Sequence, residues 1–225
     1  MAGALAGAGA DVVLHSTREQ ARATADAIAA MGSSRTACVT ADLADPAAAD
    51  RLLDGAIQAF GRIDILVNNA GIIRRAAAAD YSDDDWNAVI EVNLSSVFRL
   101  CRGAGRGMIE RGSGKIINIA SLLSFQGGIR VPAYAAAKGA VAQLTRALAN
   151  EWAGAGVCVN AIAPGYFRTD NTQALIDDPQ RYKDITARIP ARRWGDPGDL
   201  GGAVVFLASP ASDYVHGHVL VVDGG

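Results

Sequence analysis

A tyrosine and a lysine stand four positions apart in the stretch PAYAAAKGAVAQLTRALANEW, residues 132–152. Residues at positions i and i+4 share one helix face, so Tyr134 and Lys138 would project side by side near a helix start. A free tyrosine has a pKa of about 10, and a nearby ammonium or a helix N-terminus lowers it by favouring the phenolate. The pair therefore predicts a general acid/base that works near neutral pH, although this spacing also arises by chance on helix surfaces.

Two further polar residues support a chemical role for the pair. Ser121 ends the apolar run GKIINIAS, and a hydroxyl at the carboxyl end of a parallel strand can donate to an oxygen that gains negative charge. Asn93 lies inside a long helical pattern, where asparagine is unfavourable unless its side chain has a partner. A helix kink or a satisfied core amide would also explain Asn93.

Short β-branched runs alternate with longer helical stretches along the 225 residues, and these elements must position the candidate groups. The runs predict strands at residues 11–16, 35–43, 63–71, 114–121, 157–165 and 218–225. Helices are predicted at residues 18–32, 45–61, 82–112, 133–156 and 196–212. Because the strands are apolar on both faces, helices should cover both sides of the sheet. The pattern predicts the α/β class, with a Rossmann-like doubly wound parallel sheet in a single domain over residues 1–225.

Helix ends carry their own signals. Asp45 and Ser82 are expected N-caps, with Pro46 at a first helical position, and Gly32 is a natural helix stop. The glycine-rich opening, residues 1–10, is not expected to be a phosphate loop, because such a loop follows a strand and opens a helix. It is expected to be the back half of a helix that ends at Gly9.

The composition argues against several classes of protein. The net charge is −2 without a basic stripe, which argues against nucleic-acid binding, and no apolar run approaches the roughly 20 residues of a membrane helix. No positive charge precedes Arg18, so a signal peptide is not expected. Cys38, Cys101 and Cys158 lack metal-ligand spacing and predict buried free thiols in a reducing cytoplasm. The acidic run at residues 80–86 predicts a helix start rather than a metal site.

Taken together, several motifs resemble the short-chain dehydrogenase/reductase family. They are NNAG at residues 68–71, Asn93, Ser121, the Tyr134/Lys138 pair, Pro164–Gly165 with Thr169, and VDGG at residues 222–225. Their order and spacing match the family from about Asp11 to Gly225, which is nearly the whole chain. Members of this family move a hydride between a nicotinamide cofactor and a carbonyl or alcohol.

The resemblance implies a role for each matching residue. Tyr134 would be the acid/base, Ser121 would orient the reacting oxygen, and Lys138 would lower the tyrosine pKa and hold the nicotinamide ribose. Asn93 would position a water that relays protons through Lys138. Asp42 would bond the adenine amino group. The implied cofactor-binding residues are Asp42, Leu43, Asn69, Ala70, Gly71, Tyr134, Lys138, Pro164, Gly165, Phe167 and Thr169.

The family also has a first strand and a glycine-rich turn whose backbone N–H groups hold the pyrophosphate. Neither precedes residue 11 in this sequence, so we expect an N-terminally truncated fragment of a working enzyme. The predicted strand at residues 11–16 offers no acid at Ser16 or Thr17, and Arg18 follows, which favours a 2′-phosphate and hence NADP. The branch described next favours NAD, and NAD is the predicted cofactor, with NADP as the alternative.

The substrate clues are polar and cationic. Arg74 and Arg75 follow NNAG, while Gln126 and Arg130 lie between the predicted catalytic serine and tyrosine. An arginine fork suits a carboxylate, although any one arginine could equally be a solvated loop residue or part of a salt bridge.

The stretches NNAGIIRR, IASLLSFQGGIRVPAYAAAKG, ANEWA, NAIAPGYFRTDNT and IPARRWGDP resemble one branch of the family. This branch contains 2-deoxy-D-gluconate 3-dehydrogenase and gluconate 5-dehydrogenase, which interconvert a sugar acid and its keto form. Related gluconate enzymes carry a basic residue at the position of Arg75, which makes it the favoured carboxylate anchor. Gln126 and Asn171 would suit the sugar hydroxyls. The implied substrate-binding residues are Arg75, Ser121, Gln126, Arg130 and Tyr134.

Two other functions remain open from the sequence. A 3-oxoacyl-(acyl-carrier-protein) reductase or a general carbonyl reductase would share the catalytic residues but would not need Arg75. Alternatively, the truncated chain is an inactive scaffold that only oligomerises. The two long helices that contain Asn93 and Tyr134 are where this family usually packs its subunits, so a homotetramer is expected.

Overall fold

The computed structural model describes residues 1–17, 21–32 and 34–225. Arg18, which entered the prediction of the cofactor, lies outside the described residues. The strands are β1 (Val12–Ser16), β2 (Thr36–Thr40), β3 (Ile65–Asn68), β4 (Gly114–Ile119), β5 (Val157–Pro164) and β6 (Val219–Val222). The helices are α1 (Ala2–Gly7), α2 (Ala21–Ala29), α3 (Ala48–Phe60), α4 (Asp83–Ile90), α5 (Ser96–Arg111), α6 (Pro132–Trp152), α7 (Gln173–Ile176), α8 (Pro179–Arg188) and α9 (Gly201–Ala208).

Every strand pairs in parallel, as predicted, but the pairing forms two sheets rather than one. β1 pairs with β2, and a second sheet has the order β3-β4-β5-β6. Among the described residues no strand lies between β1 and β3, so these two strands are not hydrogen-bonded to each other. The α/β, Rossmann-like class of a single domain is confirmed, and its parallel strands direct their carboxyl ends to one edge.

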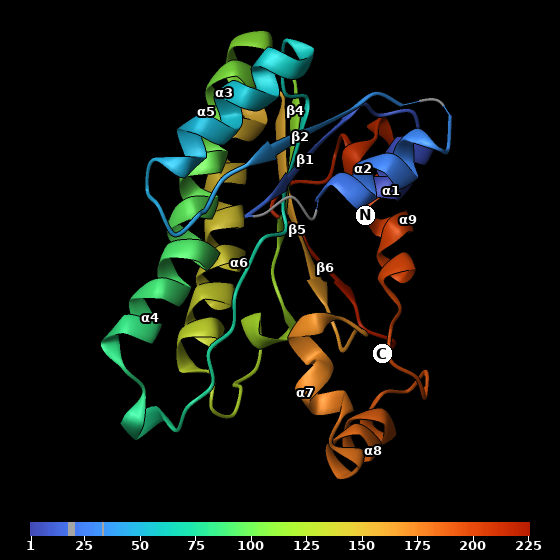
Figure 1. Ribbon diagram of the computed structural model, residues 1–225. Helices are drawn as coiled ribbons and strands as arrows, with labels where there is room; N and C mark the ends of the chain where they lie inside the picture. The colour runs from blue at the N-terminus through green and yellow to red at the C-terminus, as the bar shows by residue number, and fades with distance from the viewer. Residues whose placement is uncertain (18–20, 33) are drawn as a thin grey trace.

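Helices cover both faces of the strands, with α3, α5 and α6 on one side and α1, α2 and α9 on the other (Figure 1). Strand β4 shows how the sequence serves both layers, because successive side chains of a strand point to opposite faces. Ile116 packs in the core formed with α3, α5 and α6, whereas Ile117 and Ile119 pack in the core formed with α1 and α9. This alternation explains the strands' apolar character on both faces.

The helix between residues 82 and 112 is interrupted in the structure. Ser82 caps α4 as predicted, and its Oγ accepts the Asp85 N–H at 3.2 Å. A π-helical turn, Glu91–Ser95, then separates α4 from α5, and Asn93 lies within it. π-Helical turns are rare and are often found at functional sites.

Other helix ends agree with the sequence only in part. The opening residues form a helix, α1, as predicted, but it ends at Gly7, and Gly9 follows two residues later at φ +95°. Asp45 does not cap α3 directly, because its Oδ1 accepts the Ala47 N–H in a turn and the helix begins at Ala48. Helix α8 was not predicted, although Asp178 caps it and Pro179 stands at its first position. Helices α7 and α8 project beyond the ends of β5 and β6 (Figure 1).

Candidate active site

A cleft of about 370 Å³ opens where β3, β4 and β5 end. It brings together most of the predicted cofactor and catalytic residues, which come from segments far apart in the chain: Asn69, Gly71, Ser121, Tyr134, Lys138, Pro164, Gly165, Phe167 and Thr169. The sequence analysis gave no cleft role to several other lining residues: Met1, Ile119, Ala120, Thr172, Pro197 and Leu200. Met1 precedes α1, Ile119 and Ala120 lie at the end of β4, Thr172 follows β5, and Pro197 and Leu200 precede α9. No motif marks these positions in the sequence.

Ser121 and Tyr134 meet at the entrance to this cleft. Ser121 lies two residues beyond β4, where its Oγ accepts the Leu123 N–H at 3.1 Å and begins a 3-10 turn. Tyr134 lies in the first turn of α6 and forms a hydrogen bond with Ser121. Burial raises the pKa of Tyr134 above its usual value, while the hydrogen bond from Ser121 and the positive charge of Arg75 act in the opposite direction.

Lys138 lies one turn further along α6 and is buried. Its Nζ donates to the Ile119 carbonyl oxygen at 2.5 Å and lies 5.7 Å from the centroid of the Tyr134 ring. Burial lowers the pKa of Lys138 to about 8. We expected the lysine to bring the tyrosine pKa below its ordinary value, and here the structure differs. The phenol is sufficiently buried that desolvation dominates, and Ser121 and Arg75 are the groups that counteract it.

Asn93 is fully buried, and its side chain clamps the loop that follows β3. Its Oδ1 accepts the Ile72 N–H and its Nδ2 donates to the Ile72 carbonyl, both at 2.8 Å. A Cβ on Gly71 would lie only 3.3 Å from Asn93 Oδ1, so the small residue allows this close approach. The side chain is therefore a satisfied core amide, and the predicted role in positioning a water stays a prediction.

A buried polar chain beneath the cleft was not anticipated. Asn68 Nδ2 donates to Asn118 Oδ1 at 2.9 Å, and Asn118 Nδ2 donates to Thr145 Oγ1 at 3.0 Å. Thr145 in turn donates to the Val141 carbonyl at 2.8 Å. Asn68 Oδ1 is buried without a hydrogen-bond partner among the described residues, so the chain is not fully satisfied. Its hydrogen bonds nevertheless tie β3 to β4 and β4 to α6, the helix that carries Tyr134 and Lys138.

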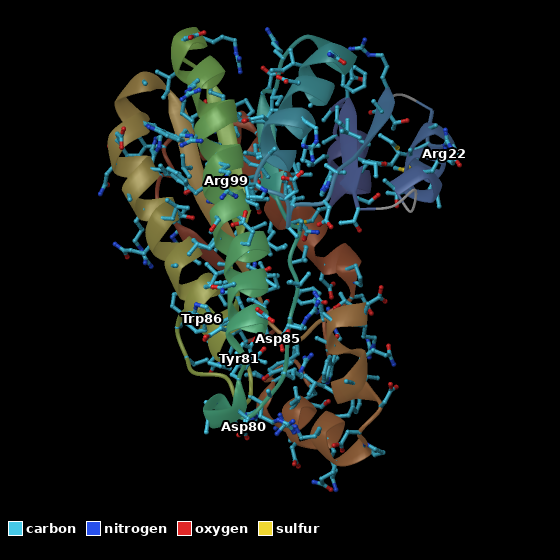
Figure 2. All side chains as sticks on the ribbon, turned by 60° about the vertical axis from the view of Figure 1, so that its left-hand side comes forward. Arg22, Asp80, Tyr81, Asp85, Trp86 and Arg99 are labelled. Carbon is cyan, nitrogen blue, oxygen red and sulfur yellow. The ribbon has the colours of Figure 1, made fainter. Side chains whose placement is uncertain are left out.

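The two neighbouring arginines after β3 have different environments. Arg74 pairs with Asp85 at 3.4 Å, and its carbonyl accepts the Tyr81 hydroxyl at 3.4 Å. Figure 2 labels Asp85 and Tyr81 beside α4, whose acidic first turn is a capped helix start as predicted. Arg75 instead donates from Nη2 to the Asn171 carbonyl at 3.2 Å, and its charge reaches Tyr134. Arg75 is exposed and is not among the residues that line the cleft, but it contacts Asn171, which is.

The other predicted substrate residues lie on the exposed loop between Ser121 and Tyr134. Gln126 and Arg130 are both exposed and are not among the residues that line the cleft. Arg130 adopts a left-handed conformation with φ +65°, and its carbonyl accepts the Ala76 N–H at 3.2 Å. A left-handed non-glycine residue is strained and needs local support. The backbone of Arg130 is therefore hydrogen-bonded to the segment that directly follows Arg74 and Arg75.

The chemistry and shape of the cleft suit a nicotinamide group. Lys138 and Ser121 supply donors, and Phe167 supplies an apolar wall, a combination that fits a flat ring with a polar amide and a ribose. Gly165 has a structural requirement, because a Cβ there would lie 2.5 Å from the Asp223 Cβ. These residues fit the nicotinamide half of a dinucleotide.

The resemblance also assigned residues to the adenosine half, and of these Asn69 and Gly71 line the cleft, whereas Asp42, Leu43 and Ala70 do not. Asp42 is exposed, and its Oδ1 accepts the Ala44 N–H at 3.0 Å. Leu43 is buried in the core that includes α3 and α5, and neither it nor Ala70 lines the cleft. Both Asp42 and Leu43 follow β2, so they lie at the carboxyl edge of the smaller sheet.

Potential metal ligands do not gather in the described part of the chain. No cluster of three or more His, Cys, Asp or Glu side chains there could hold a metal ion, and no helix there is long and apolar enough to cross a membrane. The cysteines are free, but Cys38 is exposed rather than buried because it lies on β2, which is partly open to solvent. Burial raises the pKa of the Cys101 thiol to about 12.

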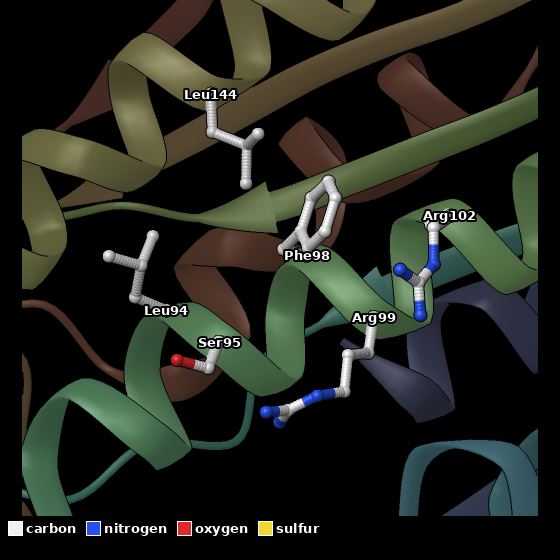
Figure 3. Close-up of a pocket in the computed structure, with 6 residues that line it drawn as sticks. All are labelled: Leu94, Ser95, Phe98, Arg99, Arg102 and Leu144. Atoms are coloured by element: carbon white, nitrogen blue, oxygen red, sulfur yellow. The ribbon is translucent and has the colours of Figure 1, made fainter. Parts of the chain in front are cut away.

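A second hollow, of about 450 Å³, lies on the outer face of α5 and α6 (Figure 3). Leu94 and Phe98 lie on one side and Leu144 projects toward them from α6, with Arg99 and Arg102 beyond (Figure 3). The Arg102 guanidinium lies 5.4 Å from the centroid of the Phe98 ring. This face is apolar at its centre and cationic at one side, and it is separate from the cleft.

Comparisons with known proteins agree with the geometry. A family model described as enoyl-(acyl carrier protein) reductase matches residues 1–225. The chain is 55% identical over 227 residues to 2-dehydro-3-deoxy-D-gluconate 5-dehydrogenase of Bacillus subtilis, covering 100% of this chain and 88% of the relative.

Solved structures are similarly close. A gluconate 5-dehydrogenase from Burkholderia cenocepacia, in complex with NADP and tartrate, is 43% identical with a TM-score of 0.94, over 100% of this chain and 88% of that one. A short-chain type dehydrogenase/reductase from Mycobacterium marinum is 34% identical with a TM-score of 0.93, at the same coverage. The chain belongs to the short-chain dehydrogenase/reductase family of NAD(P)-dependent oxidoreductases that act on CH–OH groups.

Proposed function

We propose that this chain interconverts a hydroxyl and a ketone on a sugar acid of the 2-dehydro-3-deoxy-gluconate class, acting at carbon 5. The observation that carries the proposal is the meeting of Ser121, Tyr134 and Lys138 in one cleft, with Arg75 bonded to the cleft residue Asn171 and its charge acting on Tyr134. The Bacillus and Burkholderia relatives are dehydrogenases of such acids, which supports the substrate class. The bound dinucleotide would supply or accept the hydride at its nicotinamide ring.

The residues of this chain would manage the proton. Because burial holds the pKa of Tyr134 above its usual value, the phenol stays protonated at neutral pH and is ready to donate to a carbonyl oxygen. Ser121 would donate a second hydrogen bond to the same oxygen as its charge develops. In the reverse direction the phenolate is needed, so oxidation should be favoured at higher pH than reduction.

Arg75 is the proposed carboxylate anchor. Its guanidinium donates to the neutral Asn171 carbonyl, and no ion pair within the described residues includes it, so a carboxylate would meet a charge that is not neutralised there. Charge-assisted hydrogen bonds contribute about 1.5–3 kcal/mol each, so Arg75→Ala should raise the KM for 2-dehydro-3-deoxy-D-gluconate by about 10- to 100-fold. Arg74→Ala is the matched control, because Arg74 pairs with Asp85, and its KM should change by less than about twofold.

The same pair of variants tests the competing enzyme. We expect Arg75→Ala to spare reduction of an uncharged ketone or a 3-oxoacyl thioester. If the loss is equal for the thioester and the sugar acid, or if it is absent for both, the sugar-acid proposal is wrong. The carbonyl-reductase alternative would then account for the activity.

We propose NADP(H) as the preferred cofactor, although the family branch had favoured NAD. The absence of an acid at Ser16 or Thr17 and the NADP bound to the Burkholderia relative both support this choice. Titration of NADH and NADPH into the 225-residue chain, followed by nicotinamide fluorescence, measures the preference directly. A folded protein that binds neither would support the inactive-scaffold alternative instead.

We also propose that residues 1–225 unfold as one domain and assemble as a homotetramer through the face around Phe98 and Leu144. The exposed Phe98 and the hollow beside it support this face as the subunit contact. Light scattering should give four times the chain mass, and Phe98→Glu should reduce it. A monomeric wild-type protein would contradict the assembly, and two thermal transitions in it would contradict the single domain.

A further inference from the structure

Ser124 lies between the two elements that carry the proposed catalytic groups. Its Oγ donates to the Lys138 carbonyl oxygen at 2.7 Å and accepts the Ser121 N–H at 3.3 Å. Its own N–H donates to the Ser121 carbonyl at 2.9 Å. One serine therefore holds the backbone of Ser121 on both sides and joins it to α6.

A second hydrogen bond joins Lys138 on α6 to the end of β4. Lys138 Nζ donates to the Ile119 carbonyl, two residues before Ser121 on the same strand exit. Lys138 thus contacts the end of β4 and the turn after it twice, through its side chain at Ile119 and through its backbone carbonyl at Ser124. Both contacts act on the segment that carries the Ser121 hydroxyl, so they set its position relative to Tyr134 on α6.

The two hydrogen bonds at residue 124 require a hydroxyl group. A serine hydroxyl has one donor and two acceptor lone pairs, so it can donate to Lys138 and accept from Ser121 at the same time. A helical carbonyl has a second lone pair beyond the one used within the helix, so Lys138 can accept this bond without breaking α6. A methyl group at residue 124 would leave both backbone groups without this partner, whereas threonine keeps the same oxygen.

We propose that Ser124 is a positioning residue that holds Ser121 against Tyr134 and so sets the protonation behaviour of the phenol. The inference rests on the proposed function only in taking Tyr134 as the acid/base. Ser124 is not among the residues that line the cleft, so it acts through its neighbours. Ser121 Oγ accepts the Leu123 N–H, which leaves its proton for Tyr134, and that geometry depends on the turn Ser124 closes.

The groups around the phenol predict how a change at Ser124 should shift the pKa of Tyr134. The Ser121 hydrogen bond lowers the pKa of Tyr134, so loosening that bond should raise it. Two charged groups also face the phenol, Lys138 from α6 and Arg75 from the loop after β3. Neither charged nitrogen is bonded to Ser124, because Lys138 Nζ donates to the Ile119 carbonyl and Arg75 Nη2 to the Asn171 carbonyl. We therefore expect a shift in the titration to report the hydrogen bond between Ser121 and Tyr134.

The test is a titration of Tyr134 in the free protein, which needs neither substrate nor cofactor. The pH-dependent ultraviolet absorbance of the phenolate is recorded for the chain and for Tyr134→Phe, and the difference isolates this tyrosine. The measurement is then repeated in the Ser124→Ala and Ser124→Thr backgrounds. We expect Ser124→Ala to raise the apparent pKa of Tyr134 by about 0.5–1 unit and Ser124→Thr to restore it.

Ser82→Ala is the matched control, because Ser82 also accepts a backbone N–H at a helix start but is neither a cleft residue nor a partner of Ser121. It should lower the melting temperature without moving the Tyr134 titration. If Ser124→Ala does not fold, Ser124→Cys takes its place, since a thiol keeps the size and hydrogen-bonds weakly. A folded variant at position 124 with an unchanged titration would overturn the inference.

Kinetics give a second readout once a substrate is turned over. Because Ser124 does not line the cleft, Ser124→Ala should lower kcat by about tenfold and leave KM unchanged, and its pH profile for oxidation should move to higher pH. An unchanged kcat, or a loss confined to KM, would contradict the positioning role. Failure to find any sugar-acid activity would count against the proposed function alone, because the titration decides the inference separately.

Discussion

Two lysines contact opposite ends of strand β4, and their surroundings differ. At the amino end, Lys115 donates to Asp213 at 2.6 Å and also approaches Ser212 and Cys158. At the carboxyl end, the buried Lys138 donates to a neutral carbonyl, and none of the ion pairs in the described part of the chain includes it. Lys115 is neutralised by an exposed carboxylate, whereas Lys138 has no carboxylate partner among those pairs.

The difference indicates that the amino end of β4 has a structural role and the carboxyl end a catalytic one. The Asp213 carboxylate is 68% exposed, although the Lys115 side chain is only 13% exposed, so solvent screens the pair from the carboxylate side and keeps its contribution to stability small. Burying Lys138 without a carboxylate disfavours its charged form, and burial accordingly lowers the pKa of that ammonium. A group kept in an unfavourable state beside a tyrosine and a cleft is typical of an active site.

The comparison is tested most strongly by removing the phenol. Tyr134→Phe should lower kcat by about 10³-fold, because general acid/base catalysis contributes about 10²–10⁴. The fold should be unaffected, since the lost hydroxyl has Ser121 as its partner. At the other end of β4, Lys115→Met should leave kcat within about twofold. Equal losses of kcat in the two variants would show that the two ends are not functionally distinct.

The free energy of unfolding should depend on pH because Lys138 is buried. The unfolded chain keeps the Lys138 proton up to about pH 10.5, whereas the folded state releases it near pH 8. Between these values the unfolded state binds more protons, so stability rises with pH across the window. The wild type should gain about 3 kcal/mol relative to Lys138→Met between pH 8 and 10.5.

Urea unfolding of both proteins at a series of pH values measures this gain. Lys115→Met provides the control from the amino end, and its stability should run parallel to that of the wild type. A flat difference between wild type and Lys138→Met would mean that Lys138 is hydrated in the folded protein.

Two buried asparagines sharpen the comparison further. Asn93 clamps Ile72, and Asn160 clamps the chain entering β6 in the same way, accepting the His218 N–H and donating to the Val215 carbonyl. Each Asn→Ala change leaves two backbone groups without a partner and should lower the free energy of unfolding by about 2 kcal/mol. Only Asn93→Ala should also lower kcat, by about tenfold, because its loop lines the cleft.

Denaturant unfolding and initial rates on the same samples separate the two effects. The interpretation fails if Asn160→Ala loses activity as strongly as Asn93→Ala at equal folded fraction.

The smallest change in stability is expected when the ion pair between Lys115 and Asp213 is removed. Asp213→Asn should lower the free energy of unfolding by about 0.5–1 kcal/mol at low salt and by less at high salt, because exposed charges are screened. Thermal melts of wild type and variant at low and high ionic strength measure the difference. A loss of several kcal/mol that ignores salt would show that the amino end is electrostatically buried as well.

The sequence was sufficient for features that depend on neighbours in the chain. The alternation of strands and helices, the Ser82 cap and the shared face of Tyr134 and Lys138 all follow from local spacing, and the structure contains them. The sequence could not distinguish Arg74 from Arg75, because their partners, Asp85 and Asn171, lie 11 and 96 residues away. It also missed α8, although Asp178 and Pro179 carried a start signal.

The sequence by itself determined the alternation of most strands and helices, and which chemical groups stand at the strand ends. Only the tertiary structure decided how those groups behave. The clamp of Asn93 on Ile72, the hydrogen bond of Ser124 to Lys138 and the opposing influences on the pKa of Tyr134 all depend on contacts across the fold. Periodicity and capping are properties of adjacent residues, whereas burial and long-range hydrogen bonds exist only after the layers have packed.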